Sequence, residues 1–197
     1  MKLIMSPPSP FARKARVLLR ETGLIDRVEE IQVSSSPFES AQELVAANPL
    51  GKIPTLIRED GPAIYDSRVI TRYLDGMADS GLYPTARLYE ILTLEATADE
   101  IMVVTVGMIY GERYREDAPD WTEAQWSKAA RAIAAINSRW MSHLHGPLNM
   151  AQIAVSCALS YVALRHDARN WRHGNEALAN WQAEFENRDS MQATKPA

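Results

Sequence analysis

The spacing of apolar residues in the first part of the chain predicts a βαβ unit. Short apolar runs at residues 2–5 and 28–33 predict two strands, and residues 10–22 repeat apolar side chains at helical spacing. Pro10 suits the first position of that helix, and Gly23 suits the position just after its end. A strand, a helix and a strand in this order usually place the two strands parallel.

The same part of the chain continues with a shorter helix, a hairpin and a third helix. Residues 39–47 predict a short helix. Residues 55–58 and 63–65 flank a turn and predict a hairpin. Asp66 is placed to cap a helix over residues 67–75. The predicted order of elements is therefore βαβαββα.

Helical spacing replaces strand spacing in the second part of the chain. After a linker at residues 77–86, we expect helices over residues 88–114, 122–144, 149–165 and 175–185. The third of these is apolar on all sides and is expected to be buried. The predicted fold class is α/β plus all-α, with one domain over residues 1–76 and a helical bundle over residues 87–197.

Composition and charge exclude several classes of function. The chain has 197 residues, of which 46% are hydrophobic and 23% are charged, and its net charge is -4. This balance is typical of a soluble globular protein and gives no reason to expect a nucleic-acid or membrane partner. We see no signal peptide and no apolar stretch of membrane-spanning length, so we expect a cytoplasmic protein.

The metal-binding residue types do not form a recognisable site. Cys157 is the single cysteine, which excludes an internal disulfide and a cysteine-rich zinc site. It lies in an apolar helix and is expected to pack in the core. His143 and His145 are two residues apart, so on a helix they face different directions and we expect surface histidines. No metal is expected.

The serine before the first helix is the first candidate for chemistry. Ser9 precedes Pro10 at the predicted helix start, so its hydroxyl can cap the helix. Alternatively it can donate a hydrogen bond to an anion, which the positive end of the helix dipole also favours. Considered alone, the cap is the simpler interpretation. Ser6 is a weaker candidate, because two prolines separate it from the helix start.

Two further segments have the residue types of a binding site. In Lys52-Ile53-Pro54, a trans proline is expected from its spacing; a cis bond would turn the Ile53 backbone toward a ligand. Lys52 can bind a carboxylate or simply be a solvated lysine. Asp66 and Ser67 can cap the third helix, or together bind an α-amino acid head group, which carries both charges on one carbon.

The order of these three segments resembles a known family. SPFARK after the first strand, KIPTL before the third and YDSRVITRYL at the third helix resemble the N-terminal domain of glutathione S-transferases. The segment LNMAQIAVSCALSYVALR and the residues after it resemble the end of a bacterial branch of this superfamily. The chain is similar to a serine-type, theta/tau-like member, which implies a thioredoxin-like N-terminal domain.

The resemblance implies a role for each candidate residue. Ser9 would be catalytic and would activate the thiol of glutathione. The residues that would bind glutathione are Lys52, Ile53, Pro54, Asp66 and Ser67. Pro54 would be cis, and many members have Glu where this chain has Asp66. The reaction would be attack of a thiolate on an electrophilic carbon, with glutathione as co-substrate.

The resemblance also implies a second substrate and a partner subunit. A hydrophobic electrophile is expected to contact Pro8, Phe11, Met108, Tyr110 and Tyr114. A homodimer is expected, in which Asp99 is a candidate to reach the neighbouring subunit's glutathione. Two alternatives stay open: a glutathione-binding protein without catalysis, and a glutathione-dependent peroxidase, isomerase or dehalogenase.

The chain departs from the family pattern at two places. Members that exchange disulfides usually have a cysteine near the position of Ser9, and this chain has none there. Thioltransferase chemistry through a protein cysteine is therefore not expected. Asn149 and Gln152 replace the usual Ser or Thr and Asp at the start of a C-terminal helix. Asn can cap and Gln can reach back, so a neutral capping box is expected.

Overall fold

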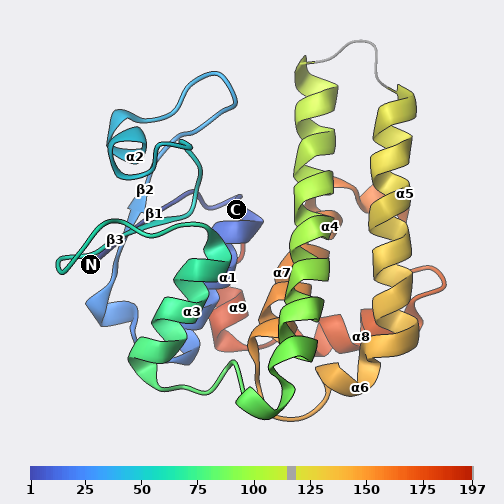
Figure 1. Cartoon of the computed structure of the whole chain (residues 1–197). Coiled ribbons are helices and arrows are strands. Elements are labelled where there is room, and N and C mark those ends of the chain that lie inside the picture. Colours follow the sequence, from blue (N-terminus) through green and yellow to red (C-terminus); the bar gives the residue numbers. More distant parts are fainter. Residues whose placement is uncertain (115–118, 197) are drawn as a thin grey trace. The chain divides into compact units, whose positions relative to one another are not determined.

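The computed structural model describes residues 1–114 and 119–196 and divides into two compact units (Figure 1). The first unit contains Met1–Tyr83 together with Arg188–Ala197, and the second contains Pro84–Asn187. The sequence prediction placed the C-terminal residues in the helical domain, whereas the structure packs them with the N-terminal unit. No helix of the described residues is long and apolar enough to cross a membrane.

A three-stranded mixed sheet organises the N-terminal unit. Its strands are β1 (Lys2–Met5), β2 (Glu29–Gln32) and β3 (Thr55–Ile57), in the order β2-β1-β3. β1 pairs with β2 in parallel, as the βαβ pattern predicts, and with β3 antiparallel. Leu3 and Ile4 are successive residues of β1 and are both buried, so both faces of the central strand are covered.

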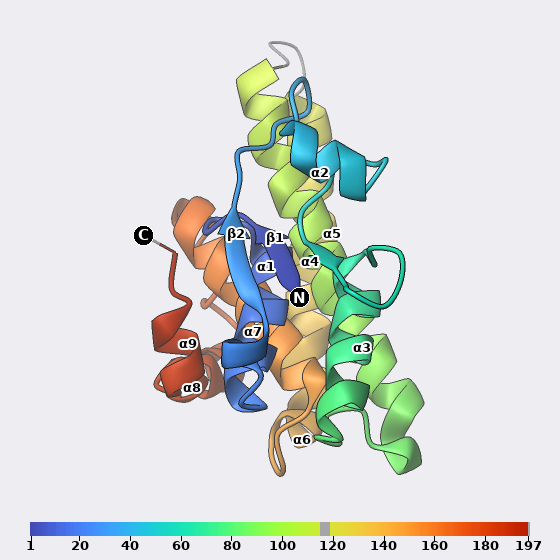
Figure 2. The same ribbon diagram turned by 90° about the vertical axis from the view of Figure 1, so that its left-hand side faces the viewer.

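Helices pack on this sheet through apolar side chains. They are α1 (Pro10–Glu21), α2 (Gln42–Ala47) and α3 (Ser67–Ala78). α1 and α3 pack against each other, as Figures 1 and 2 show. Leu44 of α2 packs with Ile4 and Val33 in one apolar cluster.

The predicted hairpin is reduced to one strand and one bridge. Leu56 and Ile64 exchange both of their backbone hydrogen bonds, at 3.0 and 2.9 Å, but the residues after Ile64 form no further ladder. Pro62 lies two residues before this pair and has no N–H to donate, which limits the pairing on that side. Arg58 Nε donates to the carbonyl of Pro62 at 3.0 Å across the turn.

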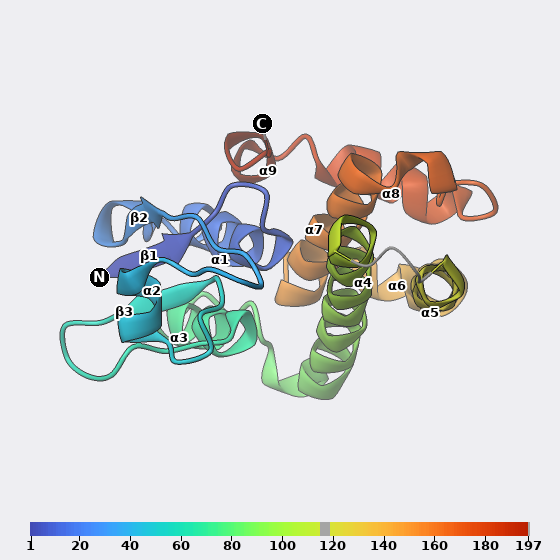
Figure 3. The same ribbon diagram turned by 90° about the horizontal axis from the view of Figure 1, so that it is seen from above.

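Within the described residues, all the regular secondary structure of the second unit is helical. Its helices are α4 (Leu88–Tyr114), α5 (Pro119–Ala135), α6 (Met141–Leu144), α7 (Met150–Arg165) and α8 (Glu176–Phe185). A π-helical turn over Ile136–Trp140 joins α5 to α6, so the predicted helix over residues 122–144 is divided. α4 packs against both α5 and α7, and Figure 3 shows α4 foreshortened beside α7.

Helix α7 is the buried centre of this unit. Most of its side chains are buried, including Cys157, so the prediction that this cysteine packs in the core is confirmed. The neutral capping box is also confirmed. Asn149 Oδ1 accepts from the Gln152 N–H and Gln152 Oε1 accepts from the Asn149 N–H, each at 3.2 Å. Gln152 Nε2 also donates to the carbonyl of Leu144 at 3.1 Å, which ties α7 to α6.

A short helix that the sequence did not predict closes the N-terminal unit. α9 (Asp189–Ala193) packs against α1. Arg13 of α1 is almost fully buried, and its Nη2 donates to the carbonyl of Met191 at 2.9 Å. At the other end of α1, Glu21 accepts two hydrogen bonds from Arg188, both 2.8 Å long. The end of the chain is therefore part of the unit that contains its beginning.

Candidate functional site

Ser9 occupies the N-cap of α1, directly after the loop that follows β1. Its backbone is extended, and its Oγ accepts a hydrogen bond from the Ala12 N–H at 3.2 Å. Its own N–H donates to the carbonyl of Ser6 at 3.0 Å. The Oγ is used as an acceptor, and within the described residues its hydrogen has no acceptor. Helix capping and donation to a ligand are therefore compatible at Ser9.

The Ile53–Pro54 peptide bond is cis. The trans bond expected from spacing alone is wrong, and the isomer that the family resemblance implies is confirmed. Pro54 is buried and Ile53 is half-buried, whereas Lys52 is exposed. The backbone of Ile53 therefore lies at the rim of the unit, where an extended ligand can pair with it.

Asn48 holds this loop in shape, and the sequence analysis did not single it out. Its side chain is buried, and its Nδ2 donates to the carbonyl of Lys52 and to Thr55 Oγ1, both at 3.0 Å. Its Oδ1 accepts from the Leu50 N–H at 3.0 Å. One amide side chain thus links both sides of the cis-proline. An Asn before Pro is a common turn residue, so the sequence alone carried no specific signal for this role.

Asp66 and Ser67 form the start of α3. Asp66 Oδ1 accepts from the Arg68 N–H at 3.1 Å and caps the helix, while Ser67 is buried. Burial raises the pKa of Asp66, but the Arg68 side chain, 3.2 Å from Oδ2, and backbone N–H groups outweigh it, so the net pKa is lowered. Asp66 is therefore an anion at neutral pH and can accept an ammonium group.

The strand register brings these three segments to one edge of the sheet. Ile4 pairs with Thr55, so the loop after β1 leaves the sheet beside the loop that contains Pro54. Leu56 pairs with Ile64 in antiparallel fashion, so the chain toward Asp66 runs back along the same loop. Helices α1 and α3 both begin at this edge.

This edge has the chemistry of a site for a zwitterionic or anionic ligand. Two helix N-termini supply backbone N–H groups and positive dipole ends, which favour anions. Ser9 offers a hydroxyl donor, Lys52 an exposed cation and Asp66 a carboxylate. Within the described residues, no group of three His, Cys, Asp or Glu side chains is arranged to hold a metal ion.

Comparison with known proteins decides the family. Residues 8–77 match the model of the glutathione S-transferase N-terminal domain, and residues 119–183 match that of the C-terminal domain. The uncharacterized GST-like protein YibF of Escherichia coli is 30% identical, and the match covers 100% of this chain and 98% of that protein. The chain belongs to the glutathione S-transferase family.

Solved glutathione transferase structures share the whole fold. A family member from Pseudomonas fluorescens Pf-5 with bound glutathione is 38% identical, with a TM-score of 0.96 over 100% of this chain and 98% of that one. A second structure from this source, with bound S-(propanoic acid)-glutathione, has 37% identity, a TM-score of 0.91 and full coverage of both chains. A glutathione S-transferase of Methylobacillus flagellatus with glutathione bound is 30% identical, with a TM-score of 0.87 over 100% and 99%.

The predicted electrophile contacts of this member of the glutathione S-transferase family lie in both units and stay predictions. Pro8 is exposed and Phe11 is half-buried at the first turn of α1. Met108 is fully buried in α4, while Tyr110 and Tyr114 are exposed near the C-terminal end of that helix. Asp99, the candidate for contact with a neighbouring subunit, is largely buried in α4.

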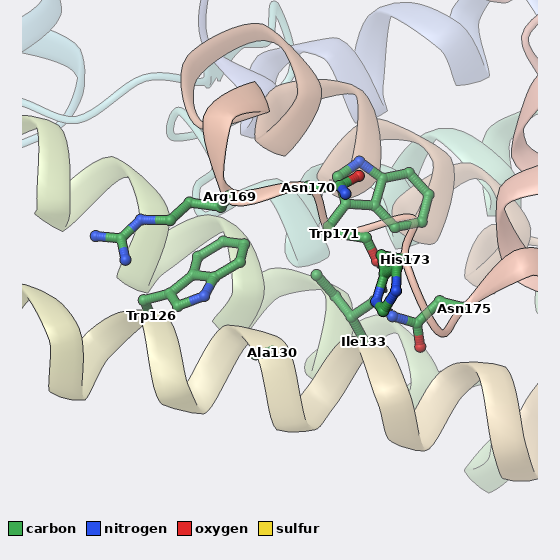
Figure 4. Close-up of a pocket in the computed structure, with 8 residues that line it drawn as sticks. All are labelled: Trp126, Ala130, Ile133, Arg169, Asn170, Trp171, His173 and Asn175. Carbon is green, nitrogen blue, oxygen red and sulfur yellow. Dashed lines mark hydrogen bonds between the residues drawn. The ribbon is translucent and has the colours of Figure 1, made fainter.

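A pocket of about 290 Å³ in the helical unit contains none of the predicted site residues (Figure 4). Its lining residues are Trp126, Ala130, Ile133, Arg169, Asn170, Trp171, His173 and Asn175. The Arg169 guanidinium of this pocket donates to both carboxylate oxygens of Glu123, at 2.8 and 2.5 Å. Asn175 Nδ2 donates to the carbonyl of Trp171 at 2.7 Å. This pocket is separate from the edge that holds Ser9.

Proposed function

We propose that this protein is a glutathione transferase that binds glutathione as its thiolate and adds it to an electrophilic small molecule. The observation that carries the proposal is the convergence of the Ser9, Pro54 and Asp66 segments at one edge of the sheet. The bound glutathione in two related structures supports the choice of ligand.

The residues of this edge match the parts of glutathione. The Asp66 carboxylate binds the ammonium group of the γ-glutamyl end, and Ser67 with the first N–H groups of α3 binds its carboxylate. The backbone of Ile53 pairs with the cysteinyl residue, and cis-Pro54 fixes that orientation. Lys52 approaches the glycine carboxylate.

Ser9 activates the thiol. Its hydroxyl hydrogen donates to the sulfur, and the positive end of α1 stabilises the same negative charge, so the pKa of the thiol falls. The thiolate is the reactive form. Holding it beside a bound electrophile turns a bimolecular reaction into an effectively unimolecular one.

The reaction class is formation of a thioether bond. The relative that binds S-(propanoic acid)-glutathione supports this class, because in that compound the glutathione sulfur is already bonded to carbon. The electrophile contacts that we propose remain Pro8, Phe11, Met108, Tyr110 and Tyr114. We also propose a homodimer, which sedimentation equilibrium tests directly.

Two measurements on the purified protein test the proposed function. Calorimetry with glutathione should give a Kd in the micromolar to millimolar range, weakened about tenfold or more by Asp66→Asn because the ion pair with the ammonium group is lost. Turnover of glutathione with 1-chloro-2,4-dinitrobenzene and with a panel of unsaturated carbonyl compounds should exceed the uncatalysed rate.

The outcomes separate the proposal from its alternatives. Binding of glutathione without turnover of any electrophile would favour a non-catalytic binding protein. Turnover of a hydroperoxide alone would favour a peroxidase. Absence of any heat with glutathione would refute the ligand and with it the whole proposal.

A further inference from the structure

Two serine side chains of the N-terminal unit hold the loop that leads into Lys52. Ser35 and Ser40 lie in the connection between β2 and α2, where they form an isolated antiparallel bridge. Ser35 Oγ and Ser40 Oγ both donate to the carbonyl of Gly51, at 3.2 and 3.1 Å. Because Gly51 directly precedes Lys52, this serine pair ties the connection after β2 to the loop that contains the proposed glutathione contacts.

The two hydroxyls of the serine pair can replace each other. Their oxygens are 3.3 Å apart, so a hydrogen bond between them is also within reach. Each hydroxyl has one hydrogen, so two hydrogens serve three contacts. If one hydroxyl donates to the other, the second still donates to the Gly51 carbonyl. One serine is therefore sufficient to hold that carbonyl, and the carbonyl loses its donor only when both hydroxyls are removed.

The backbone of Gly51 packs directly against this pair. Its φ is +59°, and a Cβ built on it would lie 2.8 Å from Ser40 Oγ. A side chain at this position would therefore displace the hydroxyl and strain the backbone. Glycine allows the close approach, so the backbone and the two hydroxyls form one packed unit.

Side chains also hold the next carbonyl of the loop. The carbonyl of Lys52 accepts from Asn48 Nδ2 and from Thr55 Oγ1, both at 3.0 Å. Four side-chain donors therefore fix two successive carbonyls, those of Gly51 and Lys52. The orientation of the two peptide planes that contain these carbonyls is set by the same contacts.

The N–H groups of these two peptides are available to a ligand. The Gly51–Lys52 bond is trans, and in a trans peptide the N–H points opposite to the carbonyl. The Lys52 N–H is therefore directed away from the serine pair. Within the described residues it donates to no acceptor, and the same holds for the Ile53 N–H. Lys52 is exposed, so a ligand can reach it.

We propose that Ser35 and Ser40 are positioning residues for the glycine end of glutathione. They orient the Gly51–Lys52 peptide so that the Lys52 N–H donates to the glycine carboxylate, beside the Lys52 ammonium group. This inference rests on the proposed function and names the residues that make the protein prefer a ligand with that carboxylate. The serine pair touches no part of the ligand and acts through the backbone of Lys52.

The order of the ligand's parts agrees with this assignment. Glycine follows the cysteinyl residue in glutathione, and Lys52 adjoins Ile53, the proposed contact of the cysteinyl residue. A hydrogen bond from a backbone N–H to a carboxylate is charge-assisted, and its strength falls steeply when donor and acceptor are misaligned. A peptide plane fixed by the serine pair keeps that alignment, whereas a peptide plane free to rotate would lose it.

A matched pair of ligands tests the inference. Glutathione and γ-glutamylcysteinylglycinamide have nearly the same shape and differ in the charge of the terminal carboxylate. Calorimetry should show that the wild-type protein binds glutathione about tenfold more tightly than the amide, as expected for charge-assisted hydrogen bonds. In the double variant Ser35→Ala/Ser40→Ala, this ratio should fall to about threefold or less, because the exposed Lys52 ammonium group then acts without an aligned N–H.

Variants of the same connection serve as controls. Ser35→Ala alone should keep most of the ratio, because Ser40 still donates to the Gly51 carbonyl. Ser36→Ala removes the adjacent hydroxyl, which bonds to the backbone two and three residues later, and should also keep the ratio. Circular dichroism confirms that each variant is folded. A change limited to the double variant separates the serine pair from the general stability of the connection.

Two further measurements report on positioning directly. In the double variant, the KM for glutathione should rise while kcat at saturating glutathione stays unchanged, because the serine pair does not touch the thiol. In the wild-type protein labelled with ¹⁵N, the Lys52 amide proton should shift downfield when glutathione binds and much less when the amide binds. The second measurement needs no variant.

Each outcome decides one question. Equal binding of the two ligands by the wild-type protein, or a Lys52 amide signal that glutathione leaves unchanged, would overturn the inference while the transferase function stands. A ratio that keeps its wild-type value in the double variant would also overturn it, because the serine pair would then serve stability alone. Absence of glutathione binding by the wild-type protein would refute the proposed function and this inference with it.

Discussion

At the scale of single residues, the Ser9 hydroxyl caps α1 and is proposed to activate the thiol of glutathione. The oxygen accepts from the Ala12 N–H and so satisfies a group that the first turn of α1 leaves without a partner. We therefore expect a substitution at Ser9 to affect both helix stability and thiol activation, and a test of its role has to separate the two.

Three substitutions at Ser9 make that separation. Ser9→Ala should lower the free energy of unfolding by about 1 kcal/mol, because the cap is lost, and should lower kcat at least about tenfold. Ser9→Asn keeps a capping side chain without the hydroxyl, so it should retain stability but lose turnover. Ser9→Thr keeps both groups. Urea denaturation and turnover with 1-chloro-2,4-dinitrobenzene measure the two effects, and full activity of Ser9→Asn would exclude a hydroxyl role.

Asn48 shows a residue whose importance arises only in three dimensions. Asn48→Ala should lower the free energy of unfolding by about 1–3 kcal/mol, because the carbonyl of Lys52 and Thr55 Oγ1 lose their buried donor. The substitution should also weaken glutathione binding, although the Asn48 side chain is not one of the proposed glutathione contacts. Calorimetry and urea denaturation measure both effects. Asn48→Asp is the matched control: it keeps the acceptor for the Leu50 N–H and removes the donors.

At the scale of elements, the capping box fixes where α7 begins. Asn149→Ala should lower the free energy of unfolding by about 1 kcal/mol, because the Gln152 N–H loses its acceptor. Asn149→Asp should be near neutral, because Asp caps equally well and adds a favourable charge at the helix N-terminus. Thermal and urea unfolding measure these effects. If both variants lost the same stability, the side-chain cap would not be the cause.

The elements show what periodicity can and cannot predict. The helix over residues 88–114 agrees with α4, because its residues keep one helical pattern without a break. The structure contains only β3 and a single bridge where the sequence predicts a hairpin. The length of a strand depends on which backbone groups form hydrogen bonds, and the spacing of apolar residues does not predict those bonds. The short α9 was missed because five residues provide too few positions to show a period.

The candidate site was predictable to a similar degree. Ser9, Pro54 and Asp66 are candidates because the family resemblance assigns each a role, whereas each is weak evidence alone. Asn48 was not found, because its function depends on contacts across the loop from Lys52 to Thr55.

At the scale of the whole molecule, the ion pair between Glu21 and Arg188 makes the free energy of unfolding depend on pH. The hydrogen bond with Arg188 lowers the pKa of Glu21 below its ordinary value, so the unfolded chain binds a proton more readily than the folded one. The stabilisation is therefore present above the ordinary pKa of a glutamate and is lost as the pH falls through the folded-state pKa.

Glu21→Gln tests this dependence. It should lower the free energy of unfolding by about 1 kcal/mol at pH 7, and the difference from wild type should shrink as the pH falls below about 4. Urea denaturation from pH 3 to pH 7 measures it. Glu39→Gln changes an exposed glutamate of the same unit and serves as the control. A difference that stays constant with pH would show that Glu21 acts through packing alone.

The return of the chain through α9 sets an order of events during synthesis. Arg13 is made early, yet its partners Met191 and Thr194 are made 178 and 181 residues later. Until the ribosome has made and released those residues, a nascent chain cannot bury Arg13 in its final surroundings. Maturation of the first unit therefore waits for synthesis of the segment that contains α9, and a stop codon placed before Met191 would leave a buried guanidinium without these two acceptors.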